Sequence, residues 1–154
     1  EALYSKNPTL IIENKILYGK QLQPKFNFKK NNLPDMICIS YGGSIEVCLD
    51  AAQKIFDEEE IIVEILPIEE LSPFNDFNIM KASERCKKFI IVEEAGGGWG
   101  FIETCKSSLA GIDGLQFETI RGPDHPIPST KKWEQKLLPN RDLLISKMKK
   151  IFNN

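Results

Sequence analysis

The chain has 154 residues, of which 42% are hydrophobic and 27% charged, and its formal net charge is −2. This size and composition fit one globular core with a short appendage and do not favour disorder. The near-neutral charge argues against any role that depends on bulk charge, so we expect neither nucleic acid nor a membrane surface as a partner.

The four cysteines and the single histidine indicate no redox, metal or nucleophilic site. The cysteines show no CxxC spacing and lie in apolar or helix-like stretches, which is typical of buried thiols in a reducing compartment. His125 has no suitably spaced partner for a metal or a cysteine nucleophile. No apolar stretch approaches the roughly 18 residues that a membrane span needs. We therefore predict no metal site and a cytoplasmic location, or the mitochondrial matrix or a plastid in a eukaryote.

The elements expected in chain order alternate between strands and helices. Four short apolar or alternating runs have the pattern of strands: 36–43, 61–66, 87–94 and 115–122. Four stretches repeat apolar residues at helical spacing: 44–60, 71–86 after a turn at Pro73, 99–111 and 140–152. The proline-rich stretch 122–140 is expected to lack regular structure. This alternation predicts an α/β fold with three αβα layers and a mostly parallel sheet of about four or five strands.

The amino-terminal residues do not fit that alternation. Thr9 to Ile12 has the pattern of an apolar strand with no sheet partner in its own segment. The following residues are polar and rich in lysine and asparagine, as in a domain connector. We therefore predict three parts: residues 1–20 as the tail end of a missing domain, 21–32 as a linker and 33–154 as the main domain.

The stretch EEAGGGWG (93–100) is similar to a phosphate-binding loop, because glycines follow a strand and precede a helix. Three features favour a close-approach turn instead. The loop follows the third strand, Glu93 and Glu94 would repel a pyrophosphate, and no acidic residue is placed to bind a ribose. The earlier YGGS (41–44) lacks the lysine of a P-loop, and we expect Ser44 to cap the next helix.

No set of side chains forms an identifiable active site. Glu93 and Glu94 are adjacent in a strand, so their side chains point to opposite faces and cannot work as a pair. Asp124 and His125 have no nucleophile nearby in the sequence. Three prolines flank this Asp–His pair: Pro123, Pro126 and Pro128. We predict no catalytic residue and interpret the proline-flanked loop as part of a rigid interface.

The stretch GPDHPIPSTKKWEQKLLPN (122–140) resembles the carboxy-terminal region of the transketolase C-terminal domain. More closely, it resembles the beta subunits of the decarboxylating component of 2-oxo acid dehydrogenases. Three further motifs extend the resemblance over nearly the whole chain: NPTLIIENKILYG (7–19), ELSPF (70–74) and VEEAGGGWG (92–100). The resemblance implies that residues 1–20 end a pyrimidine-binding domain and that 33–154 form a transketolase C-terminal-like domain.

The resemblance also implies a function for the parent enzyme. That enzyme would use thiamine diphosphate and Mg²⁺ to decarboxylate a 2-oxo acid, of the pyruvate or branched-chain type, and transfer the acyl group to lipoyl groups. We expect this fragment alone to be inactive and to bind neither cofactor. Its implied partners are an alpha subunit or alpha-like domain, a second beta subunit and the dihydrolipoyl acyltransferase core. The interface candidates are Gly97, Gly98, Trp99, Asp124, His125, Pro126 and Pro128.

Three alternatives stay open. One is another transketolase-superfamily enzyme, such as transketolase or deoxyxylulose phosphate synthase. A second is a stand-alone nucleotide-binding module of flavodoxin-like shape, and a third is an assembly domain that has lost its catalytic partner. The chain departs from the family pattern at four positions, which leaves the subfamily open: Pro67, Glu69, Ile102 and Ser129.

Overall fold

The computed structural model describes residues 4, 6–19, 33–97 and 100–154. Its centre is one sheet of four parallel strands in the order β2–β1–β3–β4. The strands are β1 (Met36–Ser40), β2 (Val63–Pro67), β3 (Lys88–Val92) and β4 (Gln116–Ile120). The predicted α/β fold with a parallel sheet is confirmed.

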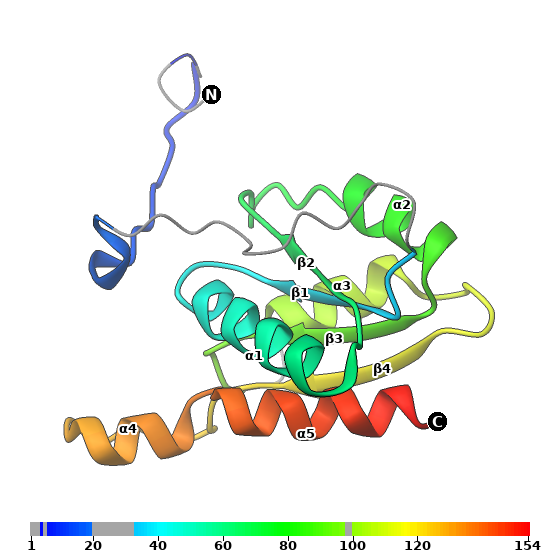
Figure 1. The fold of residues 1–154 in the computed structure, drawn as a ribbon. Helices are drawn as coiled ribbons and strands as arrows, with labels where there is room; N and C mark the ends of the chain where they lie inside the picture. Colours follow the sequence, from blue (N-terminus) through cyan, green and yellow to red (C-terminus); the bar gives the residue numbers. More distant parts are fainter. Residues whose placement is uncertain (1–3, 5, 20–32, 98–99) are drawn as a thin grey trace.

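Helices cover both faces of this sheet, as Figure 1 shows. One face packs against α1 (Ser44–Glu59) and α5 (Arg141–Phe152). The other face packs against α2 (Phe77–Arg85) and α3 (Phe101–Ser108). The predicted three-layer arrangement is therefore confirmed.

The alternation of side chains along β1 divides the core into two layers. Every residue of β1 is buried, with Met36 and Cys38 facing the α1–α5 side and Ile37 and Ile39 facing the α2–α3 side. Because helices cover both faces of the sheet at this strand, its residues form an almost continuous apolar run. Full burial of one such aliphatic side chain contributes about 1.5–3 kcal/mol. The core therefore lies directly above and below the central strands.

Two local expectations are wrong. Ser44 does not cap α1: it is the first helical residue and is buried, and Gly43 is the cap residue. The stretch 122–140 does contain regular structure, because α4 spans Lys131–Leu137. This helix fits between Pro128 and Pro139, where no proline interrupts the backbone hydrogen bonds that a helix needs.

The amino-terminal segment runs away from the sheet (Figure 1) and lies in no strand. The expected strand Thr9 to Ile12 is extended but has no sheet partner among the described residues, and its apolar side chains are exposed. A short 3₁₀ helix, Lys15–Leu17, follows it. The side chain of Asn14 contacts the main domain, because a Cβ on Gly43 would lie 2.1 Å from Asn14 Nδ2.

No helix in the described part of the chain has the length and apolarity needed to cross a membrane.

Candidate functional site

Two loops leave the carboxyl edge of the sheet and contact each other. The first follows β3 and the second follows β4, and we refer to residues 93–97 together with 121–124 as the loop pair. In open parallel sheets, the carboxyl ends of the strands are the usual place for functional groups. The loop pair also contains the glycine loop that the sequence singled out.

The main chains of the loop pair approach so closely that two positions have no room for a side chain. A Cβ added to Gly122 would lie 1.9 Å from the carbonyl oxygen of Glu94. A Cβ added to Gly96 would lie 2.2 Å from the carbonyl oxygen of Pro123. Glycine at both positions therefore permits the contact between the two backbones, as the interpretation of a close-approach turn expected.

A hydrogen bond holds the tip of the first loop to the second. The backbone N–H of Gly97 donates to Oδ1 of Asp124. Gly97 has a φ of 91°, a left-handed conformation that favours glycine. Because Asp124 already accepts from this N–H, the loop does not offer it to a phosphate. The structure thus brings together two of the predicted interface residues, while Gly98 and Trp99 lie outside the described residues.

The buried carboxylate of Glu93 joins the loop pair to α3. Glu93 is 1% exposed, and its Oε2 accepts a hydrogen bond of 3.0 Å from the backbone N–H of Phe101, the first residue of α3. A negative charge at a helix amino terminus is stabilised by the exposed N–H groups and the helix dipole. A Cβ on Gly100 would lie 2.7 Å from the same oxygen, so that glycine makes room for the carboxylate.

The sequence did not reveal this role of Glu93. The available signal was an acidic residue at the end of a strand, followed by a glycine at the start of the next helix. Its neighbour Glu94 is exposed. The two adjacent carboxylates therefore lie in different environments and do not form a pair.

Aromatic rings and an ion pair surround the loop pair. The ring of Tyr41 packs edge-on against Phe101 with 4.9 Å between ring centroids. Burial, followed by the charges of Glu93 and Glu94, raises the pKa of Tyr41 above its usual value. The hydrogen bond from Arg121 lowers the pKa of Glu103. These groups keep their ordinary charge near neutral pH, so they stabilise the loops rather than exchange protons.

His125 lies at the surface next to the loop pair. Its Nδ1 is 3.1 Å from the carbonyl oxygen of Pro126, and both residues are exposed. Pro128 is exposed as well. The described contacts of the histidine include no nucleophile.

The cysteines lie in the two core layers. All four are buried free thiols. Burial, with a smaller contribution from the charge of Glu93, raises the pKa of Cys105 to about 12. A hydrogen bond with Cys48, followed by burial, raises the pKa of Cys38. Since the thiolate is the nucleophile and the metal ligand, these shifts disfavour both functions for Cys38 and Cys105.

Comparison with known proteins identifies relatives of the chain, although no protein-family model matches it. The beta subunit of pyruvate dehydrogenase E1 from Rickettsia felis is 26% identical over 167 residues, which cover 97% of this chain and 50% of that subunit. The beta subunit of acetoin:2,6-dichlorophenolindophenol oxidoreductase from Bacillus subtilis is 27% identical over 116 residues, covering 73% of this chain and 34% of the relative.

This chain is a homologue of pyruvate dehydrogenase E1 beta subunits. The chain spans about half the length of the curated relatives it matches. Its fold is of the transketolase C-terminal type. A split-gene transketolase, described as an inactive beta4 tetramer, superposes with a TM-score of 0.69 at 15% identity, covering 79% of this chain and 40% of the other. The predicted resemblance is confirmed.

The described residues of this chain do not form a site that fits thiamine diphosphate. The exposed carboxylates at the carboxyl edge, Glu94 and Asp124, would repel a diphosphate, and the N–H of Gly97 is already bonded. In the described part of the chain, no three His, Cys, Asp or Glu side chains gather as a metal site. We assign no step of cofactor chemistry to these residues.

Proposed function

We propose that this chain is the subunit-assembly domain of a thiamine diphosphate-dependent 2-oxo acid dehydrogenase beta subunit. The parent enzyme would decarboxylate pyruvate or a branched-chain 2-oxo acid and transfer the acyl group to lipoyl groups. The observation that carries the proposal is similarity to a pyruvate dehydrogenase beta subunit over 97% of the chain.

The geometry of the loop pair supports assembly rather than catalysis. Backbone contacts at Gly96 and Gly122 and the bond between Gly97 and Asp124 fix the loops without a ligand. A surface that is rigid before binding loses less conformational entropy when a partner docks. We propose that the interface includes the loop pair and the residues that flank it: Gly97, Gly98, Trp99, Asp124, His125, Pro126 and Pro128.

We further propose three parts within the chain: 1–20 as the end of a pyrimidine-binding domain, 21–32 as a linker and 33–154 as the assembly domain. The exposed apolar side chains of Leu10, Ile11 and Ile12 support this division. Side chains that are apolar on both faces of an extended segment suit a strand buried in another sheet.

The proposed partners are an alpha subunit or alpha-like domain, a second beta subunit and the dihydrolipoyl acyltransferase core. The names of the relatives as beta subunits support the first of these. The thiamine diphosphate and Mg²⁺ of the parent enzyme would be bound outside the described residues. The proposed compartment is the cytoplasm, or the mitochondrial matrix or a plastid in a eukaryote.

The decisive experiment is an assay of the full-length gene product purified with its alpha subunit. We expect thiamine diphosphate-dependent decarboxylation of pyruvate or of a branched-chain 2-oxo acid. Activity on sugar phosphates instead would favour transketolase or deoxyxylulose phosphate synthase, and the structural likeness to a transketolase is what keeps that candidate open.

A second experiment tests the 154-residue chain alone. We expect no decarboxylase activity and no rise in Tm on adding thiamine diphosphate and Mg²⁺. The inactive beta4 tetramer of the split-gene transketolase supports this expectation. Calorimetry with NAD, ATP and FMN tests the flavodoxin-like alternative, and micromolar binding of any of these would contradict the assembly proposal.

A further inference from the structure

A continuous run of exposed residues forms an arm of the main domain. Every residue from His125 to Lys136 is exposed, and we refer to 125–136 as the arm. The arm includes most of α4, which has no buried residue. In Figure 1, α4 continues the line of α5 beyond the sheet. The arm therefore takes no part in either core layer.

Helix α4 is too short to owe its stability to itself. It spans Lys131–Leu137, whereas isolated helices shorter than about 12–15 residues are marginal in water. Helices in proteins normally gain stability by packing an apolar face, and the only residue of α4 that is even half-buried is its last one, Leu137. A helix with these properties is expected to be stabilised by contact with another molecule.

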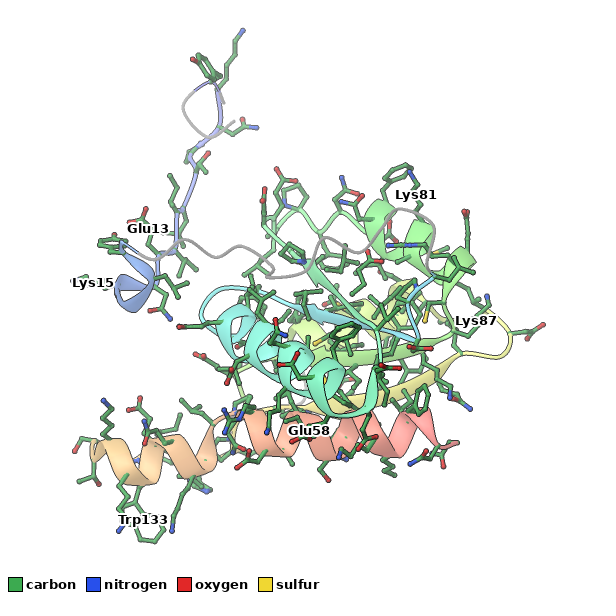
Figure 2. All side chains as sticks on the ribbon, viewed as in Figure 1. Glu13, Lys15, Glu58, Lys81, Lys87 and Trp133 are labelled. Carbon is green, nitrogen blue, oxygen red and sulfur yellow. The ribbon has the colours of Figure 1, made fainter. Side chains whose placement is uncertain are left out.

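The apolar side chains of the arm point to such a contact. Trp133 is 57% exposed and Ile127 is 41% exposed. Figure 2 shows the Trp133 side chain directed away from the sheet. Tryptophan is enriched among the residues that dominate binding energy at protein interfaces. An exposed indole on a helix whose other residues, apart from Leu137, are polar is therefore a candidate anchor.

The charge of α4 indicates what kind of surface would receive this anchor. Lys131, Lys132 and Lys136 surround Trp133, and Glu134 is the acidic residue of the helix. The Nζ of Lys136 lies 5.2 Å from the centroid of the Trp133 ring. Lys131 and Lys132 have no ion pair within the described part of the chain, so their charges remain available to a partner.

We propose that α4 docks on an acidic surface of a different subunit in the same assembly, with Trp133 inserted into an apolar pocket. The lysines around it pair with carboxylates of that subunit at the rim of the contact. Complementary charge sets the orientation and speeds the encounter, while the desolvated indole supplies most of the affinity. The choice of partner rests on the proposed function, because that function places the chain in a multisubunit enzyme.

The first test uses the assembly purified from cells that express the full-length protein together with the other subunits. A carbodiimide joins lysine amines to carboxylates only where they touch, and mass spectrometry identifies the joined peptides. We expect Lys131, Lys132 or Lys136 to be joined to Asp or Glu of a different subunit. Links only to a second copy of this chain would overturn the proposal. Chemical acetylation of the same assembly gives a second measure, because lysines in a contact react slowly. Lysines of α4 that are acetylated as fast as the exposed Lys81 would also overturn the proposal.

The second test measures subunit affinity in variants of the full-length protein. We expect Trp133→Ala to weaken assembly at least about tenfold and the double change Lys132→Glu with Lys136→Glu to weaken it further at low salt. Lys81→Glu, on the exposed side of α2, is the matched control and should leave assembly unchanged. Because none of these side chains is buried, Tm should not change in any variant.

This design separates the inference from the proposed function. An assembly that is active and whose affinity is unchanged by Trp133→Ala would refute the role of α4 while supporting the enzyme assignment. An assembly that weakens as expected but decarboxylates no 2-oxo acid would support the role of α4 while refuting the assignment.

Discussion

The loop pair and the arm are neighbours in the chain but differ in what holds them. The loop pair is fixed by contacts within the domain: two backbone approaches that exclude a Cβ and a hydrogen bond from Gly97 to Asp124. The arm begins at the next residue, His125, and contains no buried or half-buried residue. Changes in the loop pair should therefore affect folding first, whereas changes in the arm should affect only binding.

The largest effect is expected at Gly122. Gly122→Ala places a Cβ 1.9 Å from the carbonyl oxygen of Glu94, so one of the two backbones must move. We expect a loss of about 3 kcal/mol in the free energy of unfolding, measured by urea denaturation. The control is Gly114→Ala, where nothing lies within 4 Å and only the positive φ of 76° causes strain, at about 1–2 kcal/mol. Equal losses in the two variants would contradict the close approach.

The next effect is expected at Glu93. Glu93→Ala leaves the N–H of Phe101 buried without its acceptor, and we expect a loss of about 2–3 kcal/mol in urea denaturation. Glu93→Gln keeps an amide oxygen in the same place and should restore about half of that loss. Glu94→Gln is the exposed neighbour and should change stability by less than about 0.5 kcal/mol. A Gln variant as unstable as the Ala variant would rule out the hydrogen bond as the cause.

A smaller effect, which depends on pH, is expected where α5 meets β4. Lys147 Nζ lies 2.7 Å from Glu118 Oε2, Lys150 pairs with the same carboxylate, and these bonds lower the pKa of Glu118 below its ordinary value of 4.5. Because the folded-state pKa is the lower one, the stabilisation is present above about pH 4.5 and is lost as the pH falls through the folded value.

Glu118→Gln should therefore lower the free energy of unfolding by about 1 kcal/mol at pH 7. The difference between the variant and the parent chain should shrink as the pH falls from about 4.5 through the folded pKa of Glu118. Urea denaturation at a series of pH values measures both. A difference that stays constant over the series would exclude the ion pairs as its source.

The smallest effect is expected in the arm. His125→Ala and Trp133→Ala should each change the free energy of unfolding of the isolated chain by less than about 0.5 kcal/mol, because both side chains are exposed. Thermal and urea denaturation would measure this. A loss above about 1 kcal/mol would mean that the arm packs on its own domain, and the contrast with the loop pair would fail.

Much of the fold follows from the sequence because its signals are local. The apolar run at β1 and the i, i+4, i+7 spacing of Leu144, Met148 and Ile151 predicted a buried strand and the carboxy-terminal helix, and both are confirmed. Helix α4 was missed because the prolines on both sides of it predicted an irregular segment, and the short helix has no apolar periodicity that would indicate otherwise. Its hydrogen bonds need only the proline-free interval between them.

The candidate site was harder to predict, because its parts are far apart in the sequence. The sequence suggested that the glycine loop makes a close approach, but not that the approach is to Pro123 and Gly122, which follow a different strand. The capping role of Glu93 depends on the folded position of Phe101 and the missing Cβ of Gly100. Pairings of this kind are set by the sheet order and cannot be read from local composition.

The position of α5 affects how the domain can fold during synthesis. Leu144, Met148 and Ile151 complete the core layer that also contains Cys38 and Ile90 on the central strands. Until Ile151 has emerged from the ribosome, one face of the finished sheet lacks its cover, with α1 alone shielding part of it. The nascent protein therefore exposes an apolar surface until α5 has been synthesised, and a chaperone would give the greatest protection in that interval.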